Sequence, residues 1–523
     1  MKSEKKHKKE VCLIDLKSVS MQLSQNYIIF GAGAAGTAIA WFIRYIKKID
    51  KYAFCDNDVN KQSHRQAFPV FSVEETLVQE DAVYFIGFMD NDEFKLMAAE
   101  TCLKEKGVGT DRIILIDMQS SWFDNTCVAY TEYYIKSLHH NRHKERKVDE
   151  VDKICFLTGG FSSEAEKKGG GGPIGAICMQ KRYLGNKYGS VSLKYPYYEY
   201  STEPEMTFNK YWDITGTIDA VDKITKREQS AIYIANDMFS AFALYILGKN
   251  YCLIFHGQGD LVQEWTLWGR NLTEKEKKLL YEIEYVTIKN ALTVSFPSIG
   301  AKWYFEQSLN KPIDFNRSLP LYNTVYDFQE SEKVDGIERE ESKITFLSIG
   351  QFTWLKGMDR IPDFLEKYIQ DTGKMVRWIV VADGVLKEEV EQSIKLLQKC
   401  GKLEYINIDH KISHAQIFYL MNLCDVYLML HRVSIFDFST LEAMCCGKAV
   451  ILSNIPGNDE YNKENNIMLV EDPVEWDKVC NYIDNGIHYG TLNKSVYEQY
   501  FSEKVFVQRY HRLFEELIIS VKK

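Results

Sequence analysis

One carboxylate, Glu442, lies in a segment whose residue types suit the binding of a phosphate. The segment is expected to form a helix that starts near Ser439 and Thr440 and ends at Gly447, ahead of an apolar strand. A helix start presents backbone N–H groups without partners and the positive end of the helix dipole, and here two hydroxyl groups are added. The sequence therefore predicts a phosphate site at this helix start, with Glu442 one turn inside the helix.

A basic residue that complements this helix lies earlier in the chain. The apolar stretch Ile344–Ile349 is expected to be a strand, and Gly350 follows it as a turn. Lys356 and Gly357 then stand at the head of another helix. Because a lysine ammonium group attracts a phosphate as a point charge, we expect Lys356 and the helix start at 439–440 to hold one anion.

Together these segments resemble the donor half of the retaining GT-B glycosyltransferases of family 4, also called glycosyl transferases group 1. In that family a basic residue after the Gly350 turn and a Lys–Gly pair hold the diphosphate of a nucleotide sugar, and here these positions are Gln351 and Lys356. The family also has two glutamates eight positions apart, of which the second binds ribose and the first faces the donor sugar. Glu442 matches the second, whereas Ser434 stands at the first.

The resemblance extends over roughly Lys153–Lys523 and implies further site residues in an acceptor domain. The glycine loop ending in Gly171 and Gly172 would lie beside the donor phosphates, although a low-complexity surface loop is the alternative. His256 follows an expected strand and would contact the donor sugar, or else it caps that strand as a structural histidine. The resemblance implies transfer with retention, no required cofactor or metal, and His256, Lys356 and Ser434 as the catalytic residues.

A separate glycine motif lies near the N-terminus. Gly31, Gly33 and Gly36 form GxGxxG between an expected strand and helix, and Asp56 ends the next strand. This context favours a nucleotide-binding Rossmann-like domain, while a scaffold that uses the glycines only for a tight turn is the alternative. The segment resembles small Rossmann-like modules attached to bacterial polysaccharide and nucleotide-sugar-modifying proteins.

Composition limits the partners. A net charge of −9 on 523 residues argues against a nucleic-acid-binding protein, although the first ten residues form a basic tail that is either solvated or attracted to an anionic membrane surface. Twelve cysteines without a CxxC pair predict reduced thiols and no metal site. We expect a cytoplasmic protein with possible peripheral contact at the inner face of the cell membrane, since no secretory signal is visible.

The predicted fold class is α/β: a GT-B pair of Rossmann-like lobes, preceded by a small doubly wound Rossmann-like domain. The expected parts are a basic tail 1–24, the Rossmann-like domain 25–125, a polar linker 126–150, the acceptor domain 151–330, the donor domain 331–500, and a C-terminal helix 501–523 that returns to the acceptor domain.

The function expected from the resemblance is transfer of a sugar from a nucleotide-diphosphate sugar to a glycan, lipid-linked or protein acceptor. A composition rich in lysine, asparagine and tyrosine and poor in proline indicates an AT-rich bacterial genome, and hence synthesis of a surface polysaccharide or glycoprotein. Two alternatives stay open. Tyr183 and Lys187 have the spacing of an oxidoreductase pair, which with the glycine motif suggests an NAD-dependent nucleotide-sugar oxidoreductase or epimerase. The neutral Gln351 and Ser434 instead suggest a noncatalytic GT-B partner subunit.

Overall fold

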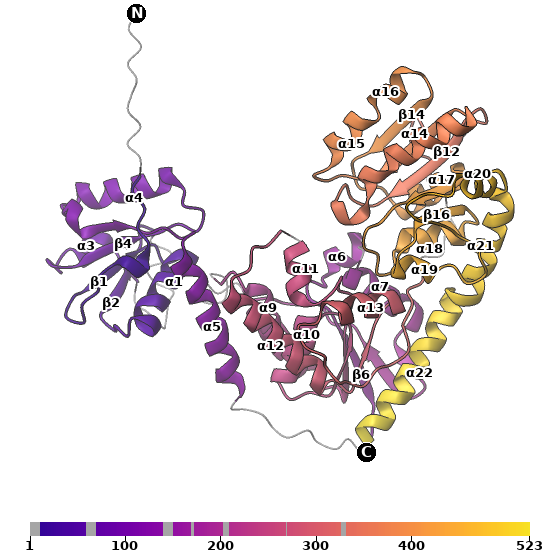
Figure 1. Ribbon diagram of the computed structural model, residues 1–523. Helices are drawn as coiled ribbons and strands as arrows, with labels where there is room; N and C mark the ends of the chain where they lie inside the picture. Colours follow the sequence, from indigo (N-terminus) through magenta and orange to yellow (C-terminus); the bar gives the residue numbers. More distant parts are fainter. Residues whose placement is uncertain are drawn as a thin grey trace, which may run out of the picture. The chain divides into compact units, whose positions relative to one another are not determined.

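The computed structural model describes residues 11–58, 70–139, 150–168, 172–201, 209–267, 269–325 and 331–522 (Figure 1). By its internal contacts the chain divides into two compact units. The first contains Met1–His143 and Glu199–Lys226, and the second contains Lys144–Tyr198 and Arg227–Lys523. The basic tail through residue 10, residues 140–149 of the expected linker, and Gly171 lie outside the described residues.

The first unit is a small α/β domain on a five-stranded sheet in the order β3-β2-β1-β4-β5. All neighbouring strands are parallel, so the predicted doubly wound domain is confirmed. Helix α5 continues to His139, and the first part of the segment expected as a linker is therefore helical. The elements are β1 (Tyr27–Phe30), α1 (Ala34–Trp41), β2 (Tyr52–Cys55), β3 (Val70–Phe71), α3 (Val73–Thr76), β4 (Val83–Ile86), α4 (Glu93–Glu105), β5 (Ile113–Leu115), α5 (Ser121–His139) and α9 (Trp212–Glu228).

The second unit contains two lobes, each with a six-stranded sheet. The first lobe has the order β11-β10-β9-β6-β8-β7, parallel except for β7. Its central strands are buried along their whole length, as expected for strands covered on both faces. The elements are β6 (Lys153–Leu157), α6 (Ser163–Lys168), α7 (Gly172–Leu184), β7 (Lys187–Tyr188), β8 (Val191–Lys194), β9 (Ile232–Ala235), α10 (Met238–Ile246), β10 (Tyr251–Ile254), α11 (Leu261–Leu267), α12 (Glu274–Asn290), β11 (Thr293–Ser295) and α13 (Ile299–Ser308).

The second lobe has a wholly parallel sheet in the order β14-β13-β12-β15-β16-β17. The two Rossmann-like lobes predicted from the sequence are thus confirmed. The elements are β12 (Ile344–Ile349), η4 (Trp354–Lys356), η5 (Met358–Arg360), α14 (Ile361–Thr372), β13 (Val376–Val381), α15 (Lys387–Ser393), α16 (Lys395–Lys399), β14 (Leu403–Ile408), α17 (His414–Leu423), β15 (Val426–Met429), α18 (Phe438–Cys445), β16 (Ala449–Ser453), α19 (Pro456–Asp459), β17 (Met468–Val470), α20 (Trp476–Asp484), α21 (Gly486–Tyr500) and α22 (Glu503–Lys522).

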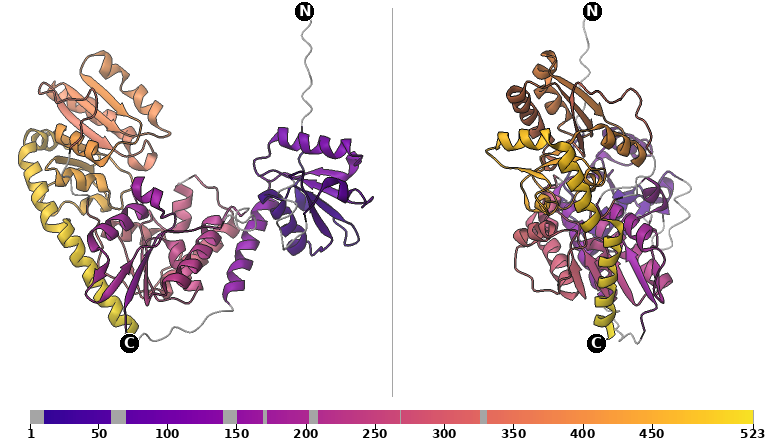
Figure 2. Two further views of the ribbon diagram at one scale, coloured as in Figure 1. Left: turned by 180° about the vertical axis from the view of Figure 1, so that it is seen from behind. Right: turned by 90° about the vertical axis from the view of Figure 1, so that its right-hand side faces the viewer.

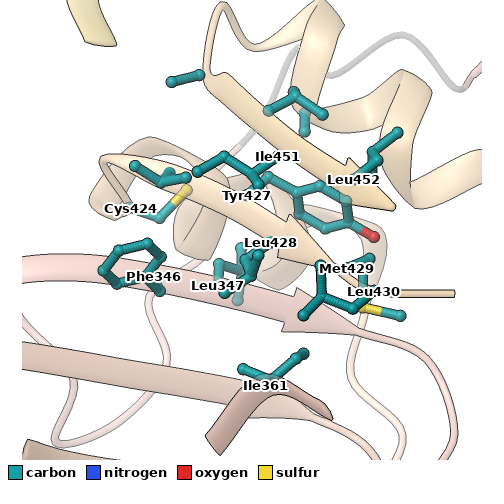
Figure 3. Packing of buried hydrophobic residues seen from close by; sticks show 14 of the residues in the cluster. Phe346, Leu347, Ile361, Cys424, Tyr427, Leu428, Met429, Leu430, Ile451 and Leu452 are labelled. Atoms are coloured by element: carbon teal, nitrogen blue, oxygen red, sulfur yellow. The ribbon is translucent and has the colours of Figure 1, made fainter. Parts of the chain in front are cut away.

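The core of the second lobe holds its central strands in fixed register. Phe346 and Leu347 of β12, Leu428 of β15 and Ile451 of β16 have no exposed surface, and Figure 3 shows these residues on neighbouring strands of the sheet. Full burial of an aliphatic or aromatic side chain stabilises a fold by about 1.5–3 kcal/mol. The loops that leave these strands therefore start from rigid positions.

Helix α22 begins beside the second lobe and packs against the first, as Figure 2 shows in yellow. The hydroxyl of Tyr510 accepts a hydrogen bond of 2.8 Å from Gln180 in α7, and Phe514 packs edge-on against Phe156 in β6. The helix thereby links the two lobes of this unit. Over the part of the chain that the structure describes, no helix has both the length and the apolar run needed to span a membrane.

Candidate functional site

Two neighbouring parallel strands of the second lobe, β12 and β15, carry the loops of the candidate site at their carboxyl ends. Gly350 and the exposed Gln351 follow β12 and lead to Lys356. Gly357 comes next with a positive φ of 62°, and a Cβ atom there would lie 1.8 Å from the carbonyl oxygen of Leu430, just after β15. Only glycine allows this close approach, which presses the Lys356 turn against the loop that follows β15.

The carboxylate of Asp437 connects these loops through three polar side chains. Its Oδ1 forms an ion pair with the Lys356 ammonium group. Its Oδ2 lies 2.8 Å from Nε2 of the fully buried His431 and accepts a 3.4 Å hydrogen bond from the Ser434 hydroxyl. The structure therefore brings the predicted residues Lys356 and Ser434 together, and it does so through an acid that the sequence analysis did not select.

The charges in this cluster are strongly coupled. Burial alone would raise the pKa of Asp437, but the nearby Lys356 and His431 outweigh burial and hold that pKa well below its usual range. Burial lowers the pKa of His431, and Asp437 opposes part of that effect. Near neutral pH the cluster therefore contains an anionic Asp437, a cationic Lys356 and a neutral imidazole.

Helix α18 starts directly after this cluster, as the sequence predicted. Asp437 is its N-cap residue, yet its side chain makes no capping hydrogen bond because it faces Lys356 and His431. In the first turn, Ser439 accepts a 2.7 Å hydrogen bond from the Tyr427 hydroxyl, and Thr440 is fully buried. The helix start therefore keeps backbone N–H groups that can meet an anion.

Glu442 lies one turn inside α18 and is 5% exposed. Its Oε1 atom lies 3.7 Å from Nδ1 of the half-exposed His414, at the start of α17. A carboxylate at this depth, with a histidine at the surface beside it, can accept hydrogen bonds from the hydroxyl groups of a sugar or ribose. The position is compatible with the role that the resemblance implies for Glu442.

His256 lies in a cavity of about 260 Å³ whose lining residues all come from the first lobe. Burial lowers the pKa of His256 to about 4, and its Nε2 atom has no hydrogen-bond partner among the described residues. Glu264 lines the same cavity, and burial together with Asp237 raises the pKa of Glu264 to about 7. The cavity thus places His256 and Glu264 beside two further ionisable lining residues, Asp237 and Arg270. It also includes Pro173, which follows the predicted Gly172.

The two lobes of the second unit meet where α13 faces α19. A Cβ on Gly300 would lie 2.5 Å from Cα of Gly457, and a Cβ on Gly457 would lie 1.7 Å from the carbonyl oxygen of Ser434. The backbone N–H of Gly300 also donates a 2.9 Å hydrogen bond to Glu460 Oε1. This contact between the lobes therefore rests directly on the loop that carries Ser434.

The glycine motif of the first unit has the geometry of a tight strand-to-helix turn. Gly31 has a φ of 95°, Gly33 is the N-cap residue of α1, and a Cβ on Gly36 would lie 2.0 Å from the carbonyl oxygen of Gly31. Asp56 is buried, and its carboxylate accepts hydrogen bonds of 2.8 Å from the N–H of Ala32 and 2.9 Å from the N–H of Asp58. These bonds support the scaffold interpretation, because they use the acid to hold the loop.

Tyr183 lies in α7, and its hydroxyl donates a 2.7 Å hydrogen bond to the carbonyl of Val325, whereas Lys187 lies in β7 beyond the end of that helix. The two residues do not share one helix face, so the spacing that suggested an oxidoreductase pair has no structural counterpart. Within the described ranges, no group of three or more histidine, cysteine, aspartate or glutamate residues is arranged to hold a metal ion.

Comparison with known proteins identifies the second lobe. Residues 329–499 match the family model of glycosyl transferases group 1. An uncharacterized glycosyltransferase of Methanocaldococcus jannaschii is 26% identical over 222 residues, which are 39% of this chain and 54% of that protein. The chain thus matches about half the length of this curated relative.

Several solved structures are similar to a large part of this chain. A glycosyltransferase of Rickettsia africae is 14% identical, with a TM-score of 0.48 over 71% of this chain and 99% of that chain. The Anabaena protein HepE, solved in complex with UDP-glucose, is 15% identical, with a TM-score of 0.46 over 70% of this chain and 100% of that chain. Residues 329–499, which hold Lys356, Asp437 and Glu442, form a domain of the glycosyl transferases group 1 family.

Proposed function

We propose that the chain transfers a sugar from a nucleoside diphosphate sugar to a glycan, lipid-linked or protein acceptor, with retention of the anomeric configuration. The observation that carries the proposal is the ion pair that brings Lys356 to Asp437 at the start of α18, within residues 329–499, which match the family model of glycosyl transferases group 1. The acceptor belongs to a bacterial surface polysaccharide or glycoprotein. The protein acts in the cytoplasm, with its basic tail in contact with the inner face of the membrane.

In this proposal the leaving diphosphate binds at the start of α18. As the glycosidic bond breaks, negative charge grows on the diphosphate, and fixed donors at that position stabilise it. The backbone N–H groups of α18, the Ser439 hydroxyl and Lys356 supply these donors, so transfer requires no metal ion. Thr440, predicted as a further donor, is fully buried and supports the helix start from inside. Gly350 and Gln351 line the phosphate side, and Glu442 holds the ribose.

The donor sugar lies toward Ser434 and His256 in this proposal. Ser434 takes the position of the family's first glutamate and offers a hydroxyl in place of a carboxylate. The unpartnered Nε2 atom of His256 supports a contact with a sugar hydroxyl. Gly172, at the start of α7, contributes its backbone N–H group to the phosphates. For the first unit we keep nucleotide binding at Gly31, Gly33 and Gly36 as a secondary proposal.

The proposal is tested by supplying the purified full-length chain with single UDP-, GDP- and ADP-sugars and measuring nucleoside diphosphate release, with and without added saccharide acceptors. We expect release from one donor class, and a strong reduction in Glu442→Gln. The matched control is Glu498→Gln, which changes an exposed glutamate on α21 of the same domain. No release from any donor, with or without acceptors, would contradict the enzymatic proposal.

A noncatalytic partner subunit is the second candidate, and the pairing of Lys356 with Asp437 favours it. That ion pair neutralises the positive charge of Lys356, which is expected to hold a diphosphate. The neighbouring Gln351 supplies no positive charge in its place. The same experiment separates the two functions, because a partner subunit that binds nucleotide without turning it over gives measurable binding and no release.

A further inference from the structure

The Lys356 ammonium group is already paired in the free protein. Asp437 contacts it directly, and the two side chains are 23% and 19% exposed. The other cations around this loop are engaged as well: Arg432 is bound to Asp359 at 2.6 and 2.7 Å, and Arg360 donates to the carbonyl of Leu430. An incoming anion therefore meets an ion pair rather than an isolated positive charge.

The formal charges of Lys356, Asp437, Glu442, Gln351 and Ser434 sum to −1, a sum that leaves out Arg360 and the Arg432–Asp359 pair of the neighbouring turn. Lys356 contributes one positive charge, Asp437 and Glu442 contribute one negative charge each, and Gln351 and Ser434 are uncharged. Electrostatic energy scales with the charge of the ligand, so each carboxylate opposes a more negative ligand more strongly. The start of α18 remains an attractive element, because Asp437 does not cap it.

A sugar nucleotide and its product differ in charge. The diphosphate of a nucleoside diphosphate sugar carries about two negative charges near pH 7, whereas the released nucleoside diphosphate has a terminal phosphate whose second ionisation, with a pKa of about 6, adds a further charge. The additional charge lies on the phosphate that was bonded to the sugar. A fixed carboxylate near that phosphate therefore disfavours the product more than the substrate.

We propose that Asp437 is a specificity-determining residue that makes the site favour the nucleoside diphosphate sugar over the released nucleoside diphosphate. It does so by neutralising Lys356 and by placing a fixed negative charge beside the leaving phosphate. The proposal rests on the proposed function, because it uses the same site. Its role in the reaction is to speed product release, a step that often limits the turnover of well-evolved enzymes.

The test compares the affinity of two ligands in wild-type and variant protein by titration calorimetry. The probes are the best-binding nucleoside diphosphate among UDP, GDP and ADP, and the corresponding nucleoside diphosphate sugar. In Asp437→Asn we expect the sugar nucleotide to bind about tenfold tighter. Since the free diphosphate carries about three charges rather than two, its affinity should rise about thirtyfold. Relative to the sugar nucleotide, the nucleoside diphosphate therefore binds about threefold tighter in Asp437→Asn than in the wild type.

Three further variants make the result specific to this carboxylate. Asp437→Ser, which is smaller and also uncharged, should shift the ratio in the same direction, so the test does not depend on one variant folding. Asp437→Glu keeps the charge and should keep the wild-type ratio. Asp359→Asn removes an equally buried carboxylate from the neighbouring Arg432 pair and should leave the ratio unchanged.

The outcomes separate this inference from the proposed function. Wild-type protein that binds the sugar nucleotide, with an unchanged or reversed ratio in both uncharged variants, would overturn the role of Asp437 and leave the transferase proposal standing. An equal shift in Asp359→Asn would also overturn it, because the effect would then belong to the general charge of the lobe. Absence of nucleotide binding in the wild type and all variants would overturn both.

Discussion

Replacing Lys356 with alanine should destabilise the start of α18. Lys356 is the direct ion-pair partner of the partly buried Asp437. After the substitution, the partners that remain for the carboxylate among the described residues are His431 at 2.8 Å and Ser434 at 3.4 Å.

The size of the effect follows from the burial of the pair. Removing one partner of a buried ion pair typically costs about 3–5 kcal/mol, since the other charge is left without compensation. Both side chains of this pair retain about a fifth of their surface exposed, and His431 can bind a proton beside Asp437. We therefore expect Lys356→Ala to lower the local stability by about 2–3 kcal/mol. The double variant Lys356→Ala with Asp437→Asn leaves no buried charge and should recover most of this loss.

The effect should depend on pH in a defined direction. The folded-state pKa of Asp437 is depressed, so the pair contributes stability above the unfolded pKa, near pH 4, and loses it only as the pH falls further toward the folded-state value. The difference between wild type and Lys356→Ala should therefore be full at pH 7. It should shrink in acid, where the carboxylate of the variant can be protonated.

Hydrogen–deuterium exchange of peptides that cover α18 measures this local stability in the full-length chain. The four proteins of a double-mutant cycle should give a coupling energy of about 2 kcal/mol between positions 356 and 437. Peptides from the first unit should exchange at the wild-type rate in all four proteins. A coupling energy near zero, or equal destabilisation by the single and double variants, would refute the assignment of Asp437 as the partner of Lys356.

Three further predictions concern other parts of the chain. Gly457→Ala places a Cβ against the carbonyl oxygen of Ser434, and we expect a lower melting temperature and at least tenfold weaker binding of a nucleoside diphosphate, measured by calorimetry. Glu284→Gln should stabilise the protein at pH 8 by about 2–4 kcal/mol and change its stability little at pH 4.5. Burial raises the pKa of Glu284 from 4.5 to about 8, so the stability of the wild type falls as the pH rises across that interval. Urea unfolding at both pH values measures the difference. Asp56→Ala should increase amide exchange at Ala32 in the first unit without changing nucleoside diphosphate release.

The sequence predicted the parts of the site that depend on local pattern. The strand before Gly350, the turn at Lys356 and the helix around Glu442 follow from apolar runs, glycine positions and helix signals that lie within a few residues of each other. The three mainly parallel sheets are also readable from such runs, because parallel sheets need continuously apolar strands.

The residues that the sequence did not reveal depend on contacts between distant segments. Asp437 is 81 positions from Lys356, and its place directly before a helix suggests an N-cap, which conceals its ion pair. The signal that could have identified Asp437 from the sequence is the presence of an acidic residue directly beside a predicted phosphate site. The close approach of Gly300 to Gly457 depends on how two helices meet and leaves no local pattern. His256 was correctly placed after a strand, but its surroundings required the fold of the first lobe.

A crystal structure of the full-length chain with a bound nucleoside diphosphate would show directly where the diphosphate lies. We expect the diphosphate at the first turn of α18, within reach of Lys356, and the ribose beside Glu442. A nucleotide bound only at the glycine turn of the first unit, or a diphosphate bound away from α18, would contradict this expectation.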